Sequence, residues 1–163
     1  MVREGLTDLY PRLWRFCLAL TGSRASADDL AQQSCLQALD KAESFQADSH
    51  LDRWIFTIAR RVWLNDRRAQ KVRVGTGVVD AQEAGLRDEK PGPETNFFTQ
   101  QVLERMSALP DGQRETVLLV YVEGFSYREA AEALDIPIGT VMSRLSAARR
   151  EMAGLREAEE VSS

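Results

Sequence analysis

Helical periodicity dominates this chain and is clearest in the stretch IPIGTVMSRLSAARREM, residues 136–152. Its apolar residues recur at spacings of three and four, which is the pattern of an amphipathic helix with one buried stripe. That stripe consists of Ile138, Val141, Leu145, Ala148 and Met152. The rest of the sequence shows no sustained alternation of apolar and polar residues, the pattern of a half-buried strand. The chain is therefore predicted to be all-α.

The N-terminal half is predicted to form three helices, two of them between residues 6 and 41. The segment TGSRASADD separates these two, because Gly22 is a typical helix end and Ser26 or Asp28 can cap the helix that follows. A long helix over 51–72 completes this half. The positions predicted to face a core are Leu9, Leu13, Phe16, Cys17, Leu20, Leu30, Ser34, Leu36, Leu39, Trp54, Ile55, Ile58, Val62 and Leu64.

The stretch 73–95, RVGTGVVDAQEAGLRDEKPGPET, lacks periodicity and is rich in glycine, proline and acidic residues. This composition is typical of a flexible acidic linker. Helical periodicity resumes over 96–109, ends at Pro110, and returns over 112–124. The pattern predicts two small helical domains joined by a linker.

Charge is segregated along the chain, although the net charge is only −4. An acidic average would argue against a nucleic-acid partner, but local patches steer polyanions more than the total does. Basic residues crowd the stretch 51–73, where the acids are Asp52 and Asp66. The basic residues there are Arg53, Arg60, Arg61, Arg67, Arg68, Lys71 and Arg73. The long helix is therefore a candidate surface for a polyanion.

No apolar run approaches the roughly 20 residues that cross a bilayer, and the N-terminus MVREGLTDLYPRLWRF lacks the apolar core of an export signal. A cytoplasmic protein without membrane insertion is therefore expected. Cys17, Cys35 and His50 are too dispersed for zinc spacing, so no metal site is expected. Both cysteines lie in helical apolar patterns, which favours buried thiols. A disulfide or redox switch is the alternative.

The C-terminal stretch has the pattern of a helix-turn-helix. Ser126 and Glu129 form a capping box that begins a helix over 126–134, a turn follows at 135–137, and the helix 138–152 comes next. In this motif the second helix enters the DNA major groove. Thr140 and Ser143 are candidates to contact bases or phosphates, and Arg144 is a candidate to contact guanine. Ala147 lies on the same helix face. Arg149 and Arg150 are candidates to contact phosphates. A plain helical hairpin with a solvated basic end is the alternative.

Three segments together resemble an extracytoplasmic-function (ECF) sigma factor of the sigma-70 family. They are DDLAQQSCLQALDKAESF, LDRWIFTIARRVWLNDRRAQK and LPDGQRETVLLVYVEGFSYREAAEALDIPIGTVMSRLSAARREM. The resemblance implies sigma region 2 over 5–73, a linker over 74–95 and sigma region 4 over 96–155. It also implies binding to promoter DNA and to core RNA polymerase, with region 2 on the β′ clamp coiled coil and region 4 on the β flap. Such proteins are not enzymes, need no cofactor, and are often held inactive by an anti-sigma factor.

The resemblance also places roles on residues of the N-terminal half. Asp29, Gln32 and Gln33 are the candidate polymerase contacts, although the family more often has an acid at position 33 and an aromatic residue at position 35. The −10 element would be recognised and opened by the loop 44–50 and the long helix. The candidate residues there are Phe45, Asp48, Ser49, His50, Trp54, Arg60, Arg61, Arg67 and Arg68. Trp54 and Trp63 stand at helical spacing, which favours core positions over base stacking.

Three other functional classes fit this sequence less well. A helix-turn-helix response regulator would need an α/β receiver domain, and the N-terminal half shows no strand pattern. A sigma mimic that only titrates an anti-sigma factor would have no use for the arginine-rich helix 138–152. An enzyme would need a phosphate loop, a nucleophile with its base, or metal-ligand spacing, and the sequence shows none of these.

Overall fold

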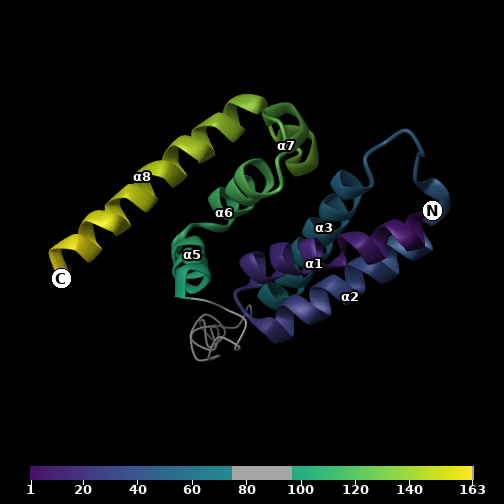
Figure 1. The fold of residues 1–163 in the computed structure, drawn as a ribbon, viewed down its shortest axis with the longest axis horizontal. Coiled ribbons are helices and arrows are strands. Elements are labelled where there is room, and N and C mark those ends of the chain that lie inside the picture. The colour runs from purple at the N-terminus through teal and green to yellow at the C-terminus, as the bar shows by residue number, and fades with distance from the viewer. Residues whose placement is uncertain (75–96, 163) are drawn as a thin grey trace. The chain divides into compact units, whose positions relative to one another are not determined.

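The structure is a computed structural model that describes residues 1–74 and 97–162 (Figure 1). The chain separates into two compact units, Met1–Lys90 and Pro91–Ser163. Across the described ranges the regular elements are all helical, which confirms the predicted all-α class. The linker predicted over 74–95 lies, apart from its first residue, outside the described residues.

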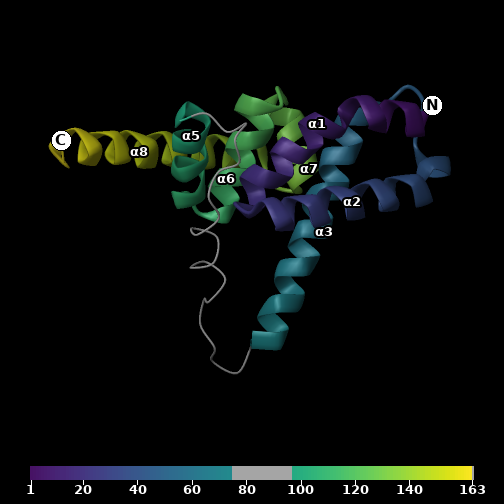
Figure 2. The ribbon, with the colours of Figure 1, turned by 60° about the horizontal axis from the view of Figure 1, so that its bottom comes forward.

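The N-terminal unit consists of α1 (Val2–Thr21), α2 (Arg24–Asp40), the short 3₁₀ helix η1 (Ala42–Ser44) and α3 (Leu51–Val74). Helix α2 packs on both α1 and α3, and the C-terminal part of α3 extends beyond them (Figure 2). The core is centred on Phe16 and Phe56, whose rings meet edge to face at 4.9 Å between centroids. Leu13, Cys17 and Leu20 are buried around them as predicted.

The turn between α1 and α2 is tighter than the sequence indicated. Gly22 ends α1 in a left-handed conformation, with φ of 75°, as expected. The cap of α2 is Ser23, whose hydroxyl accepts a hydrogen bond from the Ser26 amide at 3.3 Å, so the prediction of Ser26 or Asp28 as cap was wrong. Asp28 instead accepts a hydrogen bond from Trp14 Nε1 at 2.6 Å. One glycine suffices to reverse the chain, so the cap follows it directly.

The buried face of α2 is lined mainly with small side chains, and Leu30 is the leucine that it contains. Leu36 and Leu39 are 63% and 41% exposed, so their predicted core positions were wrong. The residues that α2 buries are Ala27, Leu30, Ala31, Ser34 and Ala38. Small side chains let α2 approach α1 and α3 closely, which leaves the two leucines on the opposite, outer face.

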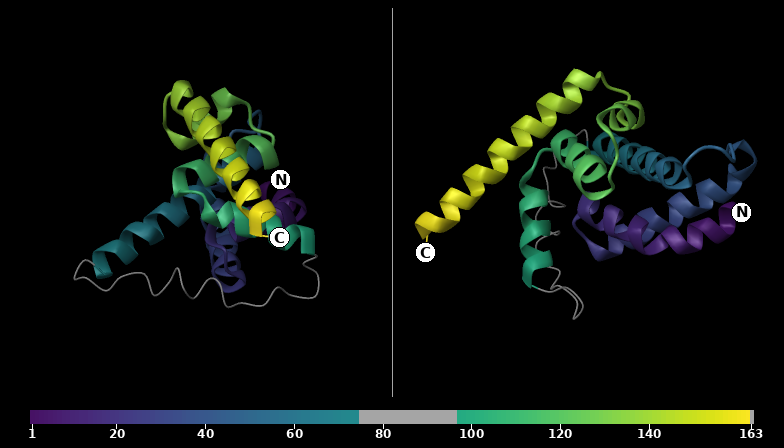
Figure 3. Two further views of the ribbon diagram at one scale, coloured as in Figure 1. Left: turned by 90° about the vertical axis from the view of Figure 1, so that its left-hand side faces the viewer. Right: turned by 45° about the horizontal axis from the view of Figure 1, so that its top comes forward.

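The C-terminal unit contains α5 (Phe97–Ala108), α6 (Asp111–Val117), the π-helical turn η2 (Leu118–Val122), α7 (Tyr127–Leu134) and α8 (Ile138–Ser162). Helix α8 packs on α6 and α7, and its C-terminal half projects beyond both (Figure 3). It also continues past residue 152, the end predicted from the sequence, to Ser162.

The helix predicted over 112–124 changes its hydrogen-bond pattern halfway. In η2 the amide of Glu123 donates to the carbonyl of Leu118 at 2.9 Å, five residues back. Gly124 ends the element with φ of 74°, at the predicted position. The wider turn leaves Leu118 buried, whereas Tyr121 is about half exposed. Such wide turns are frequent at functional sites.

The capping box at the start of α7 gives a first testable expectation. We expect Ser126→Ala to lower the free energy of unfolding of the C-terminal unit by about 1 kcal/mol, because the Glu129 amide loses its acceptor. Urea unfolding of the full chain, followed by circular dichroism, measures this change. Ser107→Ala is the matched control, since its exposed hydroxyl bonds only to the helical carbonyl of Glu104. Equal effects of the two variants would contradict a capping role.

Candidate nucleic-acid interface

The turn between α7 and α8 has the geometry that the sequence predicted. The Ser126 hydroxyl accepts from the Glu129 amide at 3.0 Å, and the Glu129 carboxylate accepts from the Ser126 amide at 3.1 Å, which confirms the capping box. Asp135 ends α7 in a left-handed conformation with φ of 54°. The amide of Ile136 then donates to the carbonyl of Ala131 at 3.1 Å, which closes the turn.

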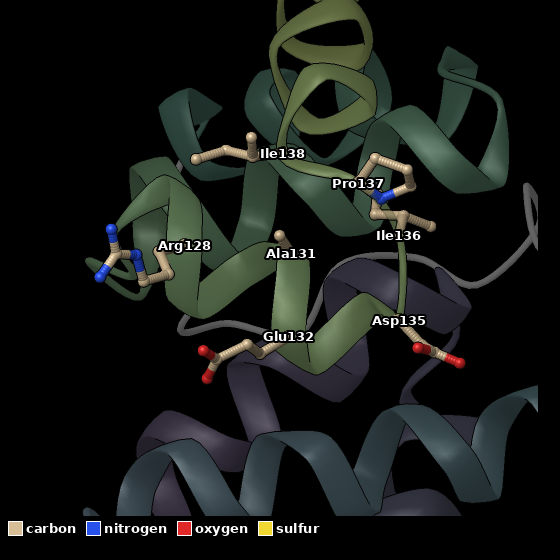
Figure 4. A pocket seen from close by; sticks show the side chains of 7 residues that line it. All are labelled: Arg128, Ala131, Glu132, Asp135, Ile136, Pro137 and Ile138. Carbon is tan, nitrogen blue, oxygen red and sulfur yellow. The ribbon is translucent and has the colours of Figure 1, made fainter.

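A shallow hollow lies at this turn (Figure 4). Ile138 and Ala131 face one another across it, while the charged ends of Arg128, Glu132 and Asp135 point away. Ile138 is 46% exposed, so its predicted place in the buried stripe was wrong. Ile138 is the first residue of α8 and lies directly after the turn, where it stays exposed.

Helix α8 has three distinct faces. Val141, Leu145 and Ala148 are buried, as predicted. The exposed face opposite to them, called the outer stripe below, consists of Gly139, Met142, Ser143, Ser146, Arg149 and Arg150. Between the two faces lies a half-buried flank of Thr140, Arg144 and Ala147.

The six predicted contacts of α8 are therefore divided between two faces. Ser143, Arg149 and Arg150 lie on the outer stripe, whereas Thr140, Arg144 and Ala147 lie on the half-buried flank. Sequence reasoning missed Met142 and Ser146, which are both exposed. Their spacing of three and four from Gly139, Ser143 and Arg150 could have identified them.

Two arginines of α8 make contacts within the C-terminal unit. Arg144 Nη1 lies 3.5 Å from both the carbonyl oxygen of Gly112 and Oε1 of Glu115, on α6. The Glu115 side chain is only 5% exposed. Arg149 Nη1 donates to the Tyr121 hydroxyl at 2.8 Å. The cationic groups of α8 thus differ in how freely each can reach DNA.

The predicted polymerase contacts on α2 share one exposed face. Asp29, Gln32 and Gln33 are exposed, and Leu36 continues the same spacing of three and four. Leu39, one turn further on, is also exposed. We call these five residues the α2 outer face. This face combines polar side chains with two exposed leucines. Exposed apolar side chains surrounded by polar ones are typical of surfaces that bind another protein.

The loop between α2 and α3 is exposed but held at both ends. At its start the Phe45 ring packs on Trp54, with centroids 5.0 Å apart. The Ser49 amide donates to the carbonyl of Gln46 at 2.9 Å and forms a turn, and Asp48, Ser49 and His50 all face solvent. The candidate base-capturing residues therefore protrude from a fixed frame.

The start of α3 is also tied to α1. Asp52 accepts hydrogen bonds from Arg12 at 3.2 Å and from Arg53 at 2.6 Å, so α3 has a fixed origin next to the loop.

The four arginines named on α3 fall into two rows. Arg61 and Arg68 are exposed and seven residues apart, two helical turns, so they lie on the same side. Arg60 and Arg67 form a neighbouring row and are half-buried, with Arg67 above the Trp63 ring at 5.2 Å. Trp63 itself is 4% exposed, which makes it a core residue. Helix α3 thus carries an extended cationic surface.

The cysteines have the environment expected of packing residues. Cys17 is fully buried and Cys35 is half-buried, and both are free thiols. Burial raises the pKa of Cys17 from 9.0 to about 12, with a smaller contribution from Cys35, and burial also raises the pKa of Cys35. A raised pKa keeps the thiol protonated and unreactive at neutral pH.

The described residues contain neither a cluster of metal ligands nor a helix that could span a membrane. No group of three or more histidine, cysteine and acidic residues there could hold a metal ion. None of the helices in the described ranges has a stretch apolar and long enough to span a bilayer.

The fold and the exposed cationic helices define a class: an all-helical protein of two units with a helix-turn-helix in the second. The family description "Sigma-70 region 2" matches residues 6–73, and "Sigma-70, region 4" matches residues 99–152. The ECF RNA polymerase sigma factor EcfG of Rhodopseudomonas palustris is 33% identical, over 94% of this chain and 84% of its own length. SigL of Mycobacterium tuberculosis is 32% identical, over 86% of this chain and 80% of its own.

A solved structure is similar over almost the whole chain. The sigma factor RpoE of Bartonella quintana, in complex with the anti-sigma factor NepR, has a TM-score of 0.80 and 28% identity, covering 95% of this chain and 96% of its own. This chain belongs to the ECF group of sigma-70 RNA polymerase sigma factors. Members of this family are regulatory factors of transcription initiation rather than catalysts.

Proposed function

We propose that this protein binds core RNA polymerase and directs it to promoters that carry two short elements at a fixed spacing. Region 2 spans residues 5–73, the linker 74–95 and region 4 96–155, limits that the matched segments 6–73 and 99–152 support. The observation that carries the proposal is that each unit exposes a cationic helix, α3 in one and α8 in the other. The protein acts in the cytoplasm, where polymerase and promoters meet, as an initiation factor rather than as an enzyme.

Region 2 has two tasks in this proposal. The α2 outer face docks on the β′ clamp coiled coil, with Leu36 and Leu39 as its apolar centre and Asp29, Gln32 and Gln33 as its polar rim. Asp48, Ser49 and His50 of the loop capture an extruded base of the −10 element. The arginine rows of α3 hold the phosphates of the opened strand. Trp54 supports the loop through its contact with Phe45.

Region 4 places α8 in the major groove at the −35 element and binds the β flap of the polymerase. Arg149 and Arg150 lie at the far end of the outer stripe, where they can reach phosphates on either side of the groove. The Arg149 hydrogen bond to Tyr121 involves an exposed tyrosine hydroxyl, so water or phosphate can replace it at small cost.

Magnitudes explain why both regions are needed. A good base contact contributes about 1–3 kcal/mol, and a stacked base contributes a similar amount. Specific binding requires about 4–10 kcal/mol over non-specific binding. Neither region alone reaches this free-energy difference. Two DNA-binding regions that the polymerase holds at one spacing can reach it together. The free protein should therefore bind promoter DNA poorly at physiological salt.

An anti-sigma factor is the proposed regulator. The similar RpoE structure was solved as a complex with an anti-sigma factor, which supports the same type of partner here. An inhibitor that covers Leu36 and Leu39 on the α2 outer face would bury exposed apolar surface and exclude the polymerase at once.

In vitro transcription tests the proposed function. Purified protein and bacterial core polymerase are incubated with fragmented genomic DNA, and transcript starts are mapped. We expect new starts that share two short motifs at one spacing. Core polymerase that is active on a control template but gives no new starts, although this protein binds it in a pull-down, would refute the proposal. Binding to an anti-sigma factor without binding to core would indicate a sigma mimic.

The α2 outer face gives a sharper expectation. We expect Leu36→Glu to weaken binding to core polymerase at least about tenfold, because a charge replaces an apolar group that the complex buries. Val72→Glu is the matched control, since Val72 is 83% exposed on α3, outside the α2 outer face. Pull-down with core polymerase over a concentration series measures both variants. Equal affinities would exclude this face as the docking surface.

A further inference from the structure

We infer that Arg144 does not read a base but positions α8 on α6, and that Met142, Ser143 and Ser146 read the −35 element. This inference rests on the proposed function, because it assumes that α8 meets promoter DNA. It goes against the usual expectation for an arginine near the start of a recognition helix, which is a bidentate contact with guanine.

The first observation is the face on which Arg144 stands. Successive residues of a helix are rotated by about 100°, so Thr140, Arg144 and Ala147 form one row beside the buried stripe. All three are half-buried, whereas Met142, Ser143 and Ser146 are exposed on the far side. Helix α6 packs on α8, and Arg144 contacts Gly112 and Glu115, which both belong to α6. Arg144 therefore faces the protein.

The second observation is how closely the guanidinium lies on α6. A Cβ atom placed on Gly112 would lie 3.0 Å from Arg144 Cζ, 3.2 Å from Nη1 and 3.3 Å from Nε. The group thus occupies the space that the missing side chain leaves. Its Nη1 reaches the carbonyl oxygen of Gly112 and the carboxylate of Glu115. Gly112 allows this close approach, since even an alanine at this position would require the guanidinium to shift slightly.

The third observation is the burial of Glu115. Its side chain is 5% exposed, and buried carboxylates are held by charged or hydrogen-bonding partners. Arg144 is one such partner. To read guanine, Arg144 would have to turn both donors of its fork into the groove and withdraw its charge from Glu115. Arg144 cannot make a bidentate contact with guanine and keep its contacts with α6 at the same time. A base contact would therefore weaken the packing of α8 on α6.

The outer stripe then determines what α8 can recognise. The Ser143 hydroxyl donates to the Gly139 carbonyl at 2.9 Å, which leaves its lone pairs to accept from adenine N6 or cytosine N4. Met142 is 49% exposed and is suited to contact a thymine methyl group. Ser146, one turn from both, offers a further hydroxyl. This chain reads the −35 element with methionine and serine side chains rather than with an arginine.

The test combines transcription with unfolding. A promoter library randomised in the −35 element is transcribed by core polymerase with the full-length protein or its variants. We expect Met142→Ala and Ser146→Ala to change the preference at one position by about tenfold. We expect Arg144→Lys and Arg144→Ala to lower transcription by the same factor from every promoter of the library, so that the order of promoter preference stays unchanged.

A charge swap separates positioning from reading. In the double variant Arg144→Glu with Glu115→Arg, the ion pair is restored in reverse, so we expect output to exceed that of Arg144→Glu alone, with the wild-type preference. Loss of preference for guanine at a single position in Arg144→Ala would overturn the inference. A wild-type protein that yields no promoter-specific starts would refute the proposed function instead.

Urea unfolding tests the positioning role of Arg144 without transcription, so it applies even if the protein yields no promoter-specific starts. Urea unfolding of the four members of the Arg144→Ala and Glu115→Gln cycle measures whether the two side chains stabilise the unit jointly. Effects that simply add would overturn the positioning role.

Discussion

Phe56→Ala is expected to unfold region 2 under conditions in which the wild-type protein is folded. Phe56 is fully buried, packs edge to face on Phe16 at 4.9 Å, and lies under the Arg12 guanidinium at 5.2 Å. Removing a buried phenylalanine side chain costs about 3–5 kcal/mol. Small domains have about 5–15 kcal/mol of stability in total. The variant therefore loses a large part of the stability of the unit that contains α1, α2 and α3.

Urea unfolding followed by circular dichroism measures this loss, together with in vitro transcription at increasing temperature. Leu36→Ala is the matched control for stability, because Leu36 is 63% exposed and its truncation should change stability by less than about 0.5 kcal/mol. A Phe56→Ala protein with the unfolding midpoint of the wild type would show that the core is not centred on the pair Phe16 and Phe56.

The double reversal Arg61→Glu with Arg68→Glu is expected to lower promoter opening about a hundredfold. Both side chains are exposed on the same side of α3. A hydrogen bond to a charged group contributes about 1.5 kcal/mol or more, so two lost phosphate contacts amount to about 3 kcal/mol, or two factors of ten. The new carboxylates add repulsion from the DNA, which makes this figure a lower limit.

Permanganate reactivity of thymines in the −10 element measures opening, and a gel shift with core polymerase verifies that the holoenzyme still forms. The matched control is Arg3→Glu with Arg15→Glu, which changes the net charge equally at exposed positions of α1. A similar loss of opening in both variants would attribute the effect to total charge. Normal opening in Arg61→Glu with Arg68→Glu would remove α3 from the proposed melting surface.

Much of the fold was predictable because its signals are local. The capping box of Ser126 and Glu129, the helix end at Gly22 and the single long helix over 51–72 each depend on residues within one or two turns. The same holds for the exposure of Asp29, Gln32 and Gln33, which share a spacing that places them on one helix face. The family resemblance then connected these local elements to a function.

The errors arose where side-chain type and environment diverge. Leu36 and Leu39 were predicted to face the core because they belong to the apolar pattern of the helix, but α2 packs through alanines, Leu30 and Ser34. Alanine contributes little to a hydrophobic pattern. For a helix that buries mainly small residues, the pattern of large apolar residues therefore indicates the wrong face as the buried one. The leucines that remain outside are exposed and belong to the proposed docking face, which the pattern did not indicate.

The sequence by itself determined the helical class, the order of the helices, the helix-turn-helix and the cationic character of α3 and α8. These features depend on periodicity and on caps, which act between neighbours along the chain. Only the tertiary structure decided which cations of α8 face solvent. Arg144 and Arg150 are the same residue type on the same helix, yet Arg144 is held by Gly112 and Glu115, which lie 32 and 29 residues away in the sequence. A contact at that separation exists only once α6 and α8 have packed, so no local pattern could predict the different environments of the two arginines.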